Sequence, residues 1–212
     1  MSARIVFKNR NFAGLLFANT ILGAAFPIQL ILGGLAGLTL APSPALATLP
    51  SSIQTFAGLL AAAPLSLLMG WLGRRVGFAV GCLLTLVGGV AGALALYSQD
   101  FTLLCVAHFF MGAGWASFQY FRFAASEVVA PNWRPVAISL MLSSLLIAAI
   151  VGPQVFIAAR DMLAPIPFAG AYVATGVIAV LGLIPLAFVK MPPPKRPSIA
   201  EPGKRFAALG AL

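Results

Sequence analysis

The sequence predicts an all-α membrane protein with six transmembrane helices. Hydrophobic residues make up 61% of the chain and charged residues only 8%, whereas a soluble domain carries about 25% charged residues. The apolar residues come in runs of about 20 or more, which is the length needed to cross a hydrocarbon core of about 30 Å. A chain of this composition cannot cover a water-facing surface, so we expect the lipid bilayer to be its first partner.

The six spans follow from apolar runs bounded by turn residues. The first run contains Pro27 and is long, so it is expected to bend or to extend beyond the membrane. It also exceeds the roughly 7–15 apolar residues of a signal peptide and is expected to be retained. The predicted six-helix domain covers residues 1–190, with spans at about 12–40, 52–72, 76–97, 101–123, 136–158 and 168–189.

The positive charges predict the orientation of the spans. All 13 Lys and Arg residues except Arg160 fall near the termini, the second–third connection or the fourth–fifth connection. Because cytoplasmic loops are enriched in Lys and Arg, both termini are expected in the cytoplasm, with a multi-pass chain in a cytoplasmic (inner) membrane. The net charge of +9 is thereby explained without a nucleic-acid partner. Residues 191–212 are predicted to form a Pro-rich, basic cytoplasmic tail.

Three short motifs lie at separate places along the spans. They are residues 70–77 (GWLGRRVG) between the second and third spans, residues 108–114 (HFFMGAG) in the fourth, and Gly152-Pro153 in the fifth. Together they resemble the N-terminal six-helix half of a major facilitator superfamily transporter, over about residues 11–190. The resemblance implies a half bundle of two three-helix repeats and a half-length member, since the family usually carries two six-helix halves.

The chain departs from the family pattern at charged positions. Arg74 stands where the loop motif carries an aspartate, and His108 stands where the fourth-helix motif begins with arginine. In the family, that acid helps to latch the two halves together at the cytoplasmic side. Arg74 is therefore expected either to anchor the loop at the membrane surface or to serve a different partner. The residues assigned to this loop motif and to a cytoplasmic gate are Gly70, Gly73, Arg74, Arg75, Gly77, Arg122 and Glu127.

Two interpretations of Arg122 stay open. It lies at the end of the fourth span among aromatic residues, where a long basic side chain can reach the membrane surface. Alternatively, it pairs with Glu127, which is the acid of the inner loops, and organises the gate.

The fourth span carries a polar stripe. His108, Trp115, Gln119 and Arg122 recur at helical spacing and share one face. A histidine in hydrocarbon is costly, so this face is expected to line the bundle interior, a cavity or another subunit. His108 is either a proton carrier, because imidazole titrates near neutral pH, or a neutral residue hydrogen-bonded to a neighbouring helix. The absence of an acid from the spans favours the neutral residue.

Other polar side chains extend the candidate pathway for a substrate or a proton. Each is either a hydrogen-bonding group for a substrate or a contact between helices worth about 1 kcal/mol. The pathway candidates are His108, Gln119, Trp115, Asn19, Gln29, Gln54 and Gln154, and the fifth-helix motif adds Gly152 and Pro153.

The resemblance implies a transporter that moves a small molecule by alternating access, as a homodimer or with a second six-helix chain. Proton coupling is a hypothesis. One alternative is a non-transporting membrane subunit that acts as a scaffold or assembly factor in a larger complex, and another is a fragment of a longer transporter. No enzyme activity, cofactor or metal site is expected, because the spans hold no paired carboxylates and Cys82 and Cys105 are interpreted as small apolar residues.

Overall fold

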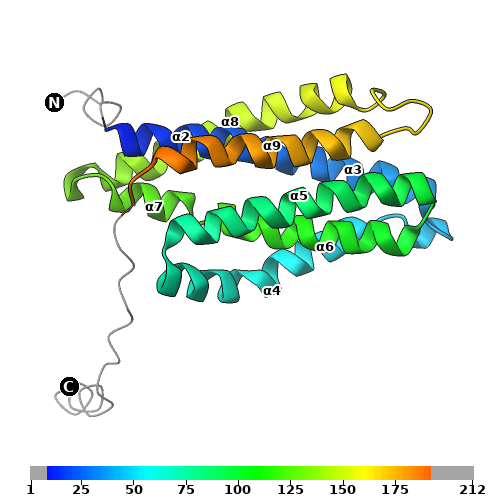
Figure 1. Cartoon of the computed structure of the whole chain (residues 1–212), viewed down its shortest axis with the longest axis horizontal. Helices are drawn as coiled ribbons and strands as arrows, with labels where there is room; N and C mark the ends of the chain where they lie inside the picture. Colours follow the sequence, from blue (N-terminus) through cyan, green and yellow to red (C-terminus); the bar gives the residue numbers. More distant parts are fainter. Residues whose placement is uncertain (1–8, 192–212) are drawn as a thin grey trace, which may run out of the picture.

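The structure, a computed structural model, is a bundle of helices that run roughly along one long axis (Figure 1). It describes residues 9–191, so Arg4, Lys8 and the predicted tail beyond Met191 lie outside the described residues. The α-helices are α2 (Arg10–Gly23), α3 (Ala25–Leu40), α4 (Leu49–Leu72), α5 (Arg74–Ser98), α6 (Phe101–Phe118), α7 (Phe121–Glu127), α8 (Arg134–Ala159) and α9 (Ala169–Phe188), with short 3-10 helices η1 (Pro44–Leu46) and η2 (Pro131–Trp133).

Six segments are long and apolar enough to cross a membrane, which confirms the predicted fold class. The third and sixth are the single helices α5 and α9, and the second and fifth are α4 and α8, each preceded by a short 3-10 helix. The first and fourth are each made of two α-helices, α2 with α3 and α6 with α7. No strand occurs within residues 9–191. A helix satisfies its own backbone hydrogen bonds, which is the requirement that hydrocarbon places on a spanning segment.

The first and fourth spans are interrupted. The first breaks at Ala24, three residues before Pro27, and the expected bend is thereby confirmed. Pro27 lies in the first turn of α3, where its missing N–H is not needed. The fourth span breaks at Gln119 and Tyr120 without a proline. These two spans correspond to the first helices of the two three-helix repeats that the family resemblance implies.

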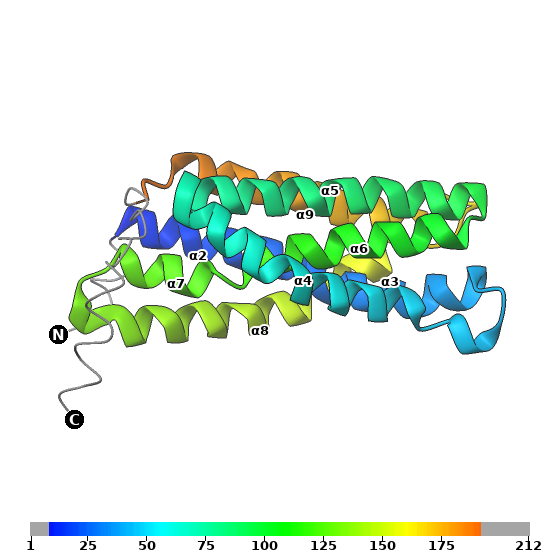
Figure 2. The ribbon, with the colours of Figure 1, turned by 90° about the horizontal axis from the view of Figure 1, so that it is seen from below.

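The helices pack most closely around glycines. α5 packs between α6 and α9, and α4 packs on α6. A Cβ atom at Gly89 would come within 3.0 Å of the Gly176 backbone nitrogen in α9, so these backbones lie almost in contact. On the other side, α2 packs against α8 and α9, so that α5 and α8 lie on opposite sides of the bundle (Figure 2). Small residues therefore set the spacing of the core, as is usual between membrane helices.

α4 and α8 are the least buried spans. Only 17% of the α4 segment and 28% of the α8 segment are buried, against 44–56% for the other four. Large apolar side chains project from both helices, among them Leu59, Leu67, Leu146, Ile147 and Ile150. These faces are suited to lipid or to a second protein unit.

One end of the bundle gathers most of the described basic residues. The beginnings of α2, α5 and α8 and the end of α9 all lie at this end, whereas the α8–α9 connection, which carries Arg160, lies at the other (Figure 1). Several hydrogen bonds tie these segments together. Arg75 donates to the carbonyl oxygen of Ala187 (2.8 Å), and Asn9 donates to that of Val128 (2.6 Å). Arg75 thus supplies a donor for one of the carbonyl oxygens that the last turn of α9 leaves without a partner in the helix.

Candidate substrate cavity and the polar network beside it

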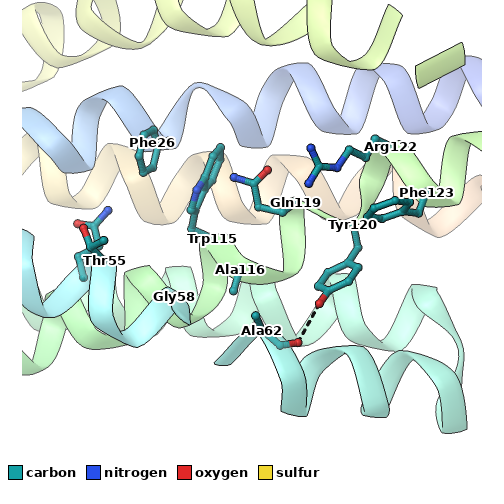
Figure 3. Close-up of a pocket in the computed structure, with 11 residues that line it drawn as sticks. Phe26, Thr55, Gly58, Ala62, Trp115, Ala116, Gln119, Tyr120, Arg122 and Phe123 are labelled. Atoms are coloured by element: carbon teal, nitrogen blue, oxygen red, sulfur yellow. Dashed lines mark hydrogen bonds between the residues drawn. The ribbon is translucent and has the colours of Figure 1, made fainter. Parts of the chain in front are cut away.

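A cavity of about 410 Å³ lies between α3, α4 and the break between α6 and α7 (Figure 3). Its volume falls in the range of about 300–1,000 Å³ that is typical of small-molecule sites. Both interrupted spans border it, since Phe26 follows the first break and Gln119 and Tyr120 form the second. Interrupted helices at equivalent places in two repeats are the usual position of a transporter's binding site. The lining residues are Phe26, Gln54, Thr55, Gly58, Ala62, Trp115, Ala116, Gln119, Tyr120, Arg122 and Phe123.

The cavity has an aromatic wall. The rings of Phe26 and Trp115 are stacked with centroids 4.3 Å apart and planes at 18°. Because Phe26 belongs to α3 and Trp115 to α6, this stack joins the two interrupted spans. An indole ring beside a cavity is a good surface for another planar ring.

Polar side chains line another part of the wall, beside small apolar residues such as Ala62 and Ala116. In Figure 3, Gln119 and Arg122 follow Trp115 along the same side of the cavity, and the guanidinium group of Arg122 points toward Gln119. The Tyr120 hydroxyl donates to the backbone carbonyl oxygen of Ala62 in α4 (2.9 Å), which holds the break against that helix. The Cζ atom of Arg122 also lies 5.1 Å from the centroid of the Phe123 ring, within the range of a cation–π contact.

A buried polar network lies beside the cavity, centred on His108. The His108 side chain is fully buried, with Nδ1 2.8 Å from Gln54 Oε1 and Nε2 2.8 Å from the Tyr172 hydroxyl. Gln54 in turn donates from Nε2 to Gln29 Oε1 (3.1 Å). Since the Gln54 oxygen accepts, Nδ1 carries the proton and Nε2 accepts from the tyrosine, a tautomer assigned from the network. The network thus runs from α9 through α6 and α4 to α3 with no formal charge.

The predicted pathway residues divide into three groups. Trp115 and Gln119 line the cavity, and Gln54 belongs to both the cavity and the network. His108 and Gln29 are in the network but do not line the cavity. The other two lie elsewhere. Asn19 donates to Met141 O (3.0 Å) and Ser144 Oγ (2.8 Å) and so joins α2 to α8, while Gln154 is exposed on α8.

Four aromatic residues at these sites were not among the sequence-based candidates, namely Phe26, Tyr120, Phe123 and Tyr172. Phe26 directly precedes Pro27, so the expected bend was a usable signal for it. Tyr172 and Tyr120 each carry a hydroxyl inside an apolar segment, and such a group needs a hydrogen-bond partner when buried. Their partners, His108 and Ala62, lie 64 and 58 residues away in the chain, so the sequence alone does not reveal them.

The glycine motifs serve backbone geometry at separate places. Gly73 has φ 91°, which a residue with a side chain adopts only with strain, and it forms the turn between α4 and α5. Gly152 packs α8 against the break in the first span, because a Cβ atom there would lie 2.7 Å from Ala24 O and 3.1 Å from Pro27 Cβ.

Arg74 forms an ion pair within the chain. Its Nε and Nη2 atoms donate to the two carboxylate oxygens of Glu127, each at 2.6 Å. Of the two roles expected for Arg74, the structure therefore gives it a different partner. In this structure Glu127 pairs with Arg74 and not with Arg122, the partner that one interpretation expected. The bond fastens the start of α5 to the end of α7.

Reversing this ion pair gives a first prediction. Arg74→Glu is expected to lower the free energy of unfolding by about 1 kcal/mol or less, because Arg74 and Glu127 side chains are 24% and 43% exposed and solvent screens the pair. The double variant Arg74→Glu/Glu127→Arg is expected to recover most of the loss. Unfolding of the purified protein in detergent measures both. Arg134→Glu, an exposed reversal at the same end, is the control, and additive effects of the two reversals would contradict the prediction.

The His108 network gives a second prediction. His108→Ala is expected to lower the free energy of unfolding by about 1–3 kcal/mol, because it leaves the buried Gln54 oxygen and Tyr172 hydroxyl without their partner. Tyr172→Phe alone should lower the free energy of unfolding by less than His108→Ala does. The double variant should be only slightly less stable than His108→Ala, and a double-mutant cycle measures this coupling. Val106→Ala on an exposed part of the same helix is the control. Equal losses for His108→Ala and Val106→Ala would show that the network does not stabilise the fold.

No family model matches the sequence, but two curated proteins and one solved structure are similar to the chain. The chain is 33% identical over 183 residues to the riboflavin transporter RfnT of Brucella anthropi, covering 86% of this chain and 46% of that protein. It is 27% identical over 183 residues to the uncharacterized MFS-type transporter YddS of Bacillus subtilis, covering 84% and 42%.

A solved structure agrees with these relatives. The fucose:proton symporter FucP of Escherichia coli superposes with a TM-score of 0.69 at 16% identity, over 95% of this chain and 55% of that one. The chain thus spans about half the length of the proteins it matches. It is a half-length homologue of major facilitator superfamily transporters and has the fold of that superfamily.

Proposed function

We propose that this chain forms one half of a membrane transporter that moves a small molecule by alternating access. The observation that carries the proposal is the cavity of about 410 Å³ at the two interrupted spans. Alternating access requires two units that rock around such a site. We therefore propose that a second six-helix unit completes it, whether another copy of this chain, another chain or a further part of a longer chain. The weakly buried faces of α4 and α8 are the surfaces on which we place that unit.

We further propose that both termini face the cytoplasm and that the membrane is a cytoplasmic (inner) one. The support is the distribution of charge, since Arg10, Arg74, Arg134 and Lys190 lie at one end of the bundle and Arg160 at the other. Lys and Arg accumulate in the short loops that stay in the cytoplasm.

The proposed substrate is a planar aromatic molecule, and riboflavin is the first compound to test. The stacked Phe26 and Trp115 rings offer the surface that such a ring needs. RfnT, which is 33% identical to this chain, is named a riboflavin transporter. The amides of Gln54 and Gln119 would hydrogen-bond to carbonyl or hydroxyl groups on the ring.

Proton coupling through His108 stays a separate proposal. Both ring nitrogens already have neutral partners, and a second proton would require the Tyr172 hydroxyl to turn from donor to acceptor. Uptake into vesicles with and without a pH gradient, in wild type and His108→Asn, tests it. Equal uptake under all four conditions would rule out a role for His108 in coupling.

The central test is the composition of the assembly. Gentle purification from native membranes, followed by mass measurement, is expected to give a symmetric dimer or a complex with one other six-helix unit. The same preparation, reconstituted in liposomes, is expected to take up riboflavin or a related aromatic compound. Stoichiometric incorporation into an unrelated membrane complex without uptake would instead favour a scaffold or assembly factor.

A further inference from the structure

The cavity contains a single formal charge, which contacts the Phe123 ring but forms no ion pair within residues 9–191. Of the described residues that line it, Arg122 alone is ionised at neutral pH. Its Nε atom is buried and has no hydrogen-bond partner within residues 9–191. Leaving a guanidinium nitrogen buried and unpaired is costly, so a partner for this group is expected.

No acid within residues 9–191 pairs with Arg122. Each carboxylate oxygen of Glu127 accepts a hydrogen bond from Arg74 instead. Asp100 caps the start of α6 by accepting from Thr102 and Leu103, and Asp161 pairs with Arg160. The segments that carry these two aspartates lie at the end of the bundle remote from α7 (Figure 1).

The unpaired charge lies next to the aromatic wall. Figure 3 shows Trp115, Gln119 and Arg122 in succession along one side of the cavity, with the guanidinium group directed back along it. A ring beside Trp115 would therefore hold a substituent within reach of Gln119 and Arg122. A guanidinium group binds carboxylate and phosphate through paired, charge-assisted hydrogen bonds.

We propose that the cavity selects aromatic organic anions, with the ring at Trp115 and a carboxylate or phosphate at Arg122. This inference rests on the proposed transport function and narrows its substrate class. The anion supplies an acceptor for the guanidinium group of Arg122 that is directed along the cavity (Figure 3), and the ring supplies the apolar surface that brings the anion there.

Matched pairs of compounds test the inference on the purified assembly in neutral detergent. Riboflavin and riboflavin 5′-phosphate share one ring system, and nicotinamide and nicotinate share another. Equilibrium dialysis is expected to show that, in at least one pair, the anionic member binds about ten times more tightly than the neutral member, or more. Hydrogen bonds to a charged group contribute about 1.5–3 kcal/mol. In Arg122→Gln the preference should disappear, Arg122→Lys should keep part of it, and Arg134→Gln should keep all of it.

The outcomes separate this inference from the transporter proposal. Equal or tighter binding of the neutral members, or a preference that survives Arg122→Gln, overturns the anion site and leaves transport standing. Displacement of the anionic compound by phosphatidylglycerol at equal concentration would assign Arg122 to lipid headgroups and would also overturn it. Failure of every compound to bind, together with a lack of uptake in liposomes, overturns both proposals.

Discussion

Gly112→Ala is expected to force α4 away from α6 and to lower the free energy of unfolding by about 1–3 kcal/mol. A Cβ atom at Gly112 would overlap the backbone carbonyl oxygen of Gln54, and a backbone atom cannot rotate out of the way as a side chain can. Gly58 faces the same crossing, since a Cβ atom there would lie 3.4 Å from Gly112 O. Because Gln54 also belongs to the cavity and the His108 network, ligand binding should fall together with stability.

Two other glycines provide the control for this crossing. A Cβ atom at Gly34 in α3 or at Gly70 in α4 would meet nothing within 4 Å. Alanine at these positions is expected to be neutral or slightly stabilising, since alanine is more favourable than glycine inside a helix by up to about 1 kcal/mol. Unfolding in detergent compares the three variants. A Gly112→Ala variant as stable as Gly34→Ala would mean that the two helices are not in backbone contact.

Trp115→Ala is expected to weaken the binding of riboflavin or another aromatic ligand by roughly tenfold to a hundredfold. The substitution removes the ring that lines the cavity and leaves Phe26 without its stacking partner. Burial of an aromatic side chain and its stacking together contribute about 1.5–3 kcal/mol, which corresponds to that range of affinity. Equilibrium dialysis measures the change.

The matched control is Trp71→Ala. Trp71 lies on α4, is 63% exposed and does not line the cavity. Its removal should leave affinity unchanged, whereas Trp115→Phe should keep part of the affinity because a smaller ring remains. If Trp71→Ala and Trp115→Ala weakened binding equally, the aromatic wall would not be the binding surface.

The spans could be predicted because length and polarity act locally. An apolar run either crosses about 30 Å of hydrocarbon or does not, and the predicted limits agree with helices such as α5 (Arg74–Ser98) to within a few residues. The bend near Pro27 also has a local cause. The break at Gln119 and Tyr120 does not, because neither residue disfavours a helix strongly. At that break, the Tyr120 hydroxyl donates a hydrogen bond to Ala62 in another helix, and this long-range contact helps to hold the break in place.

The pairing of polar residues could not be predicted, because it depends on how each helix is rotated and how deep it lies. The spacing that placed His108 and Arg122 on one face assumed a continuous helix, whereas the break at Gln119 and Tyr120 lies between them. His108 bonds to Gln54 and Tyr172, and Arg122 lines the cavity. Glu127 shows the same limit. Its sequence neighbour Arg122 was a plausible partner, and the actual one, Arg74, is 53 residues away.

The neutrality of the network from Tyr172 to Gln29 has a consequence for voltage. A charge that moves through the membrane potential gains or loses about 2.3 kcal/mol per 100 mV, whereas amides, a phenol and an uncharged imidazole move through it without such a term. Within the described residues, the cavity carries only the charge of Arg122. For the proposed transport function, membrane potential should therefore act on the substrate and on any protons coupled to it far more than on these buried helices. The current per molecule transported should report their combined charge.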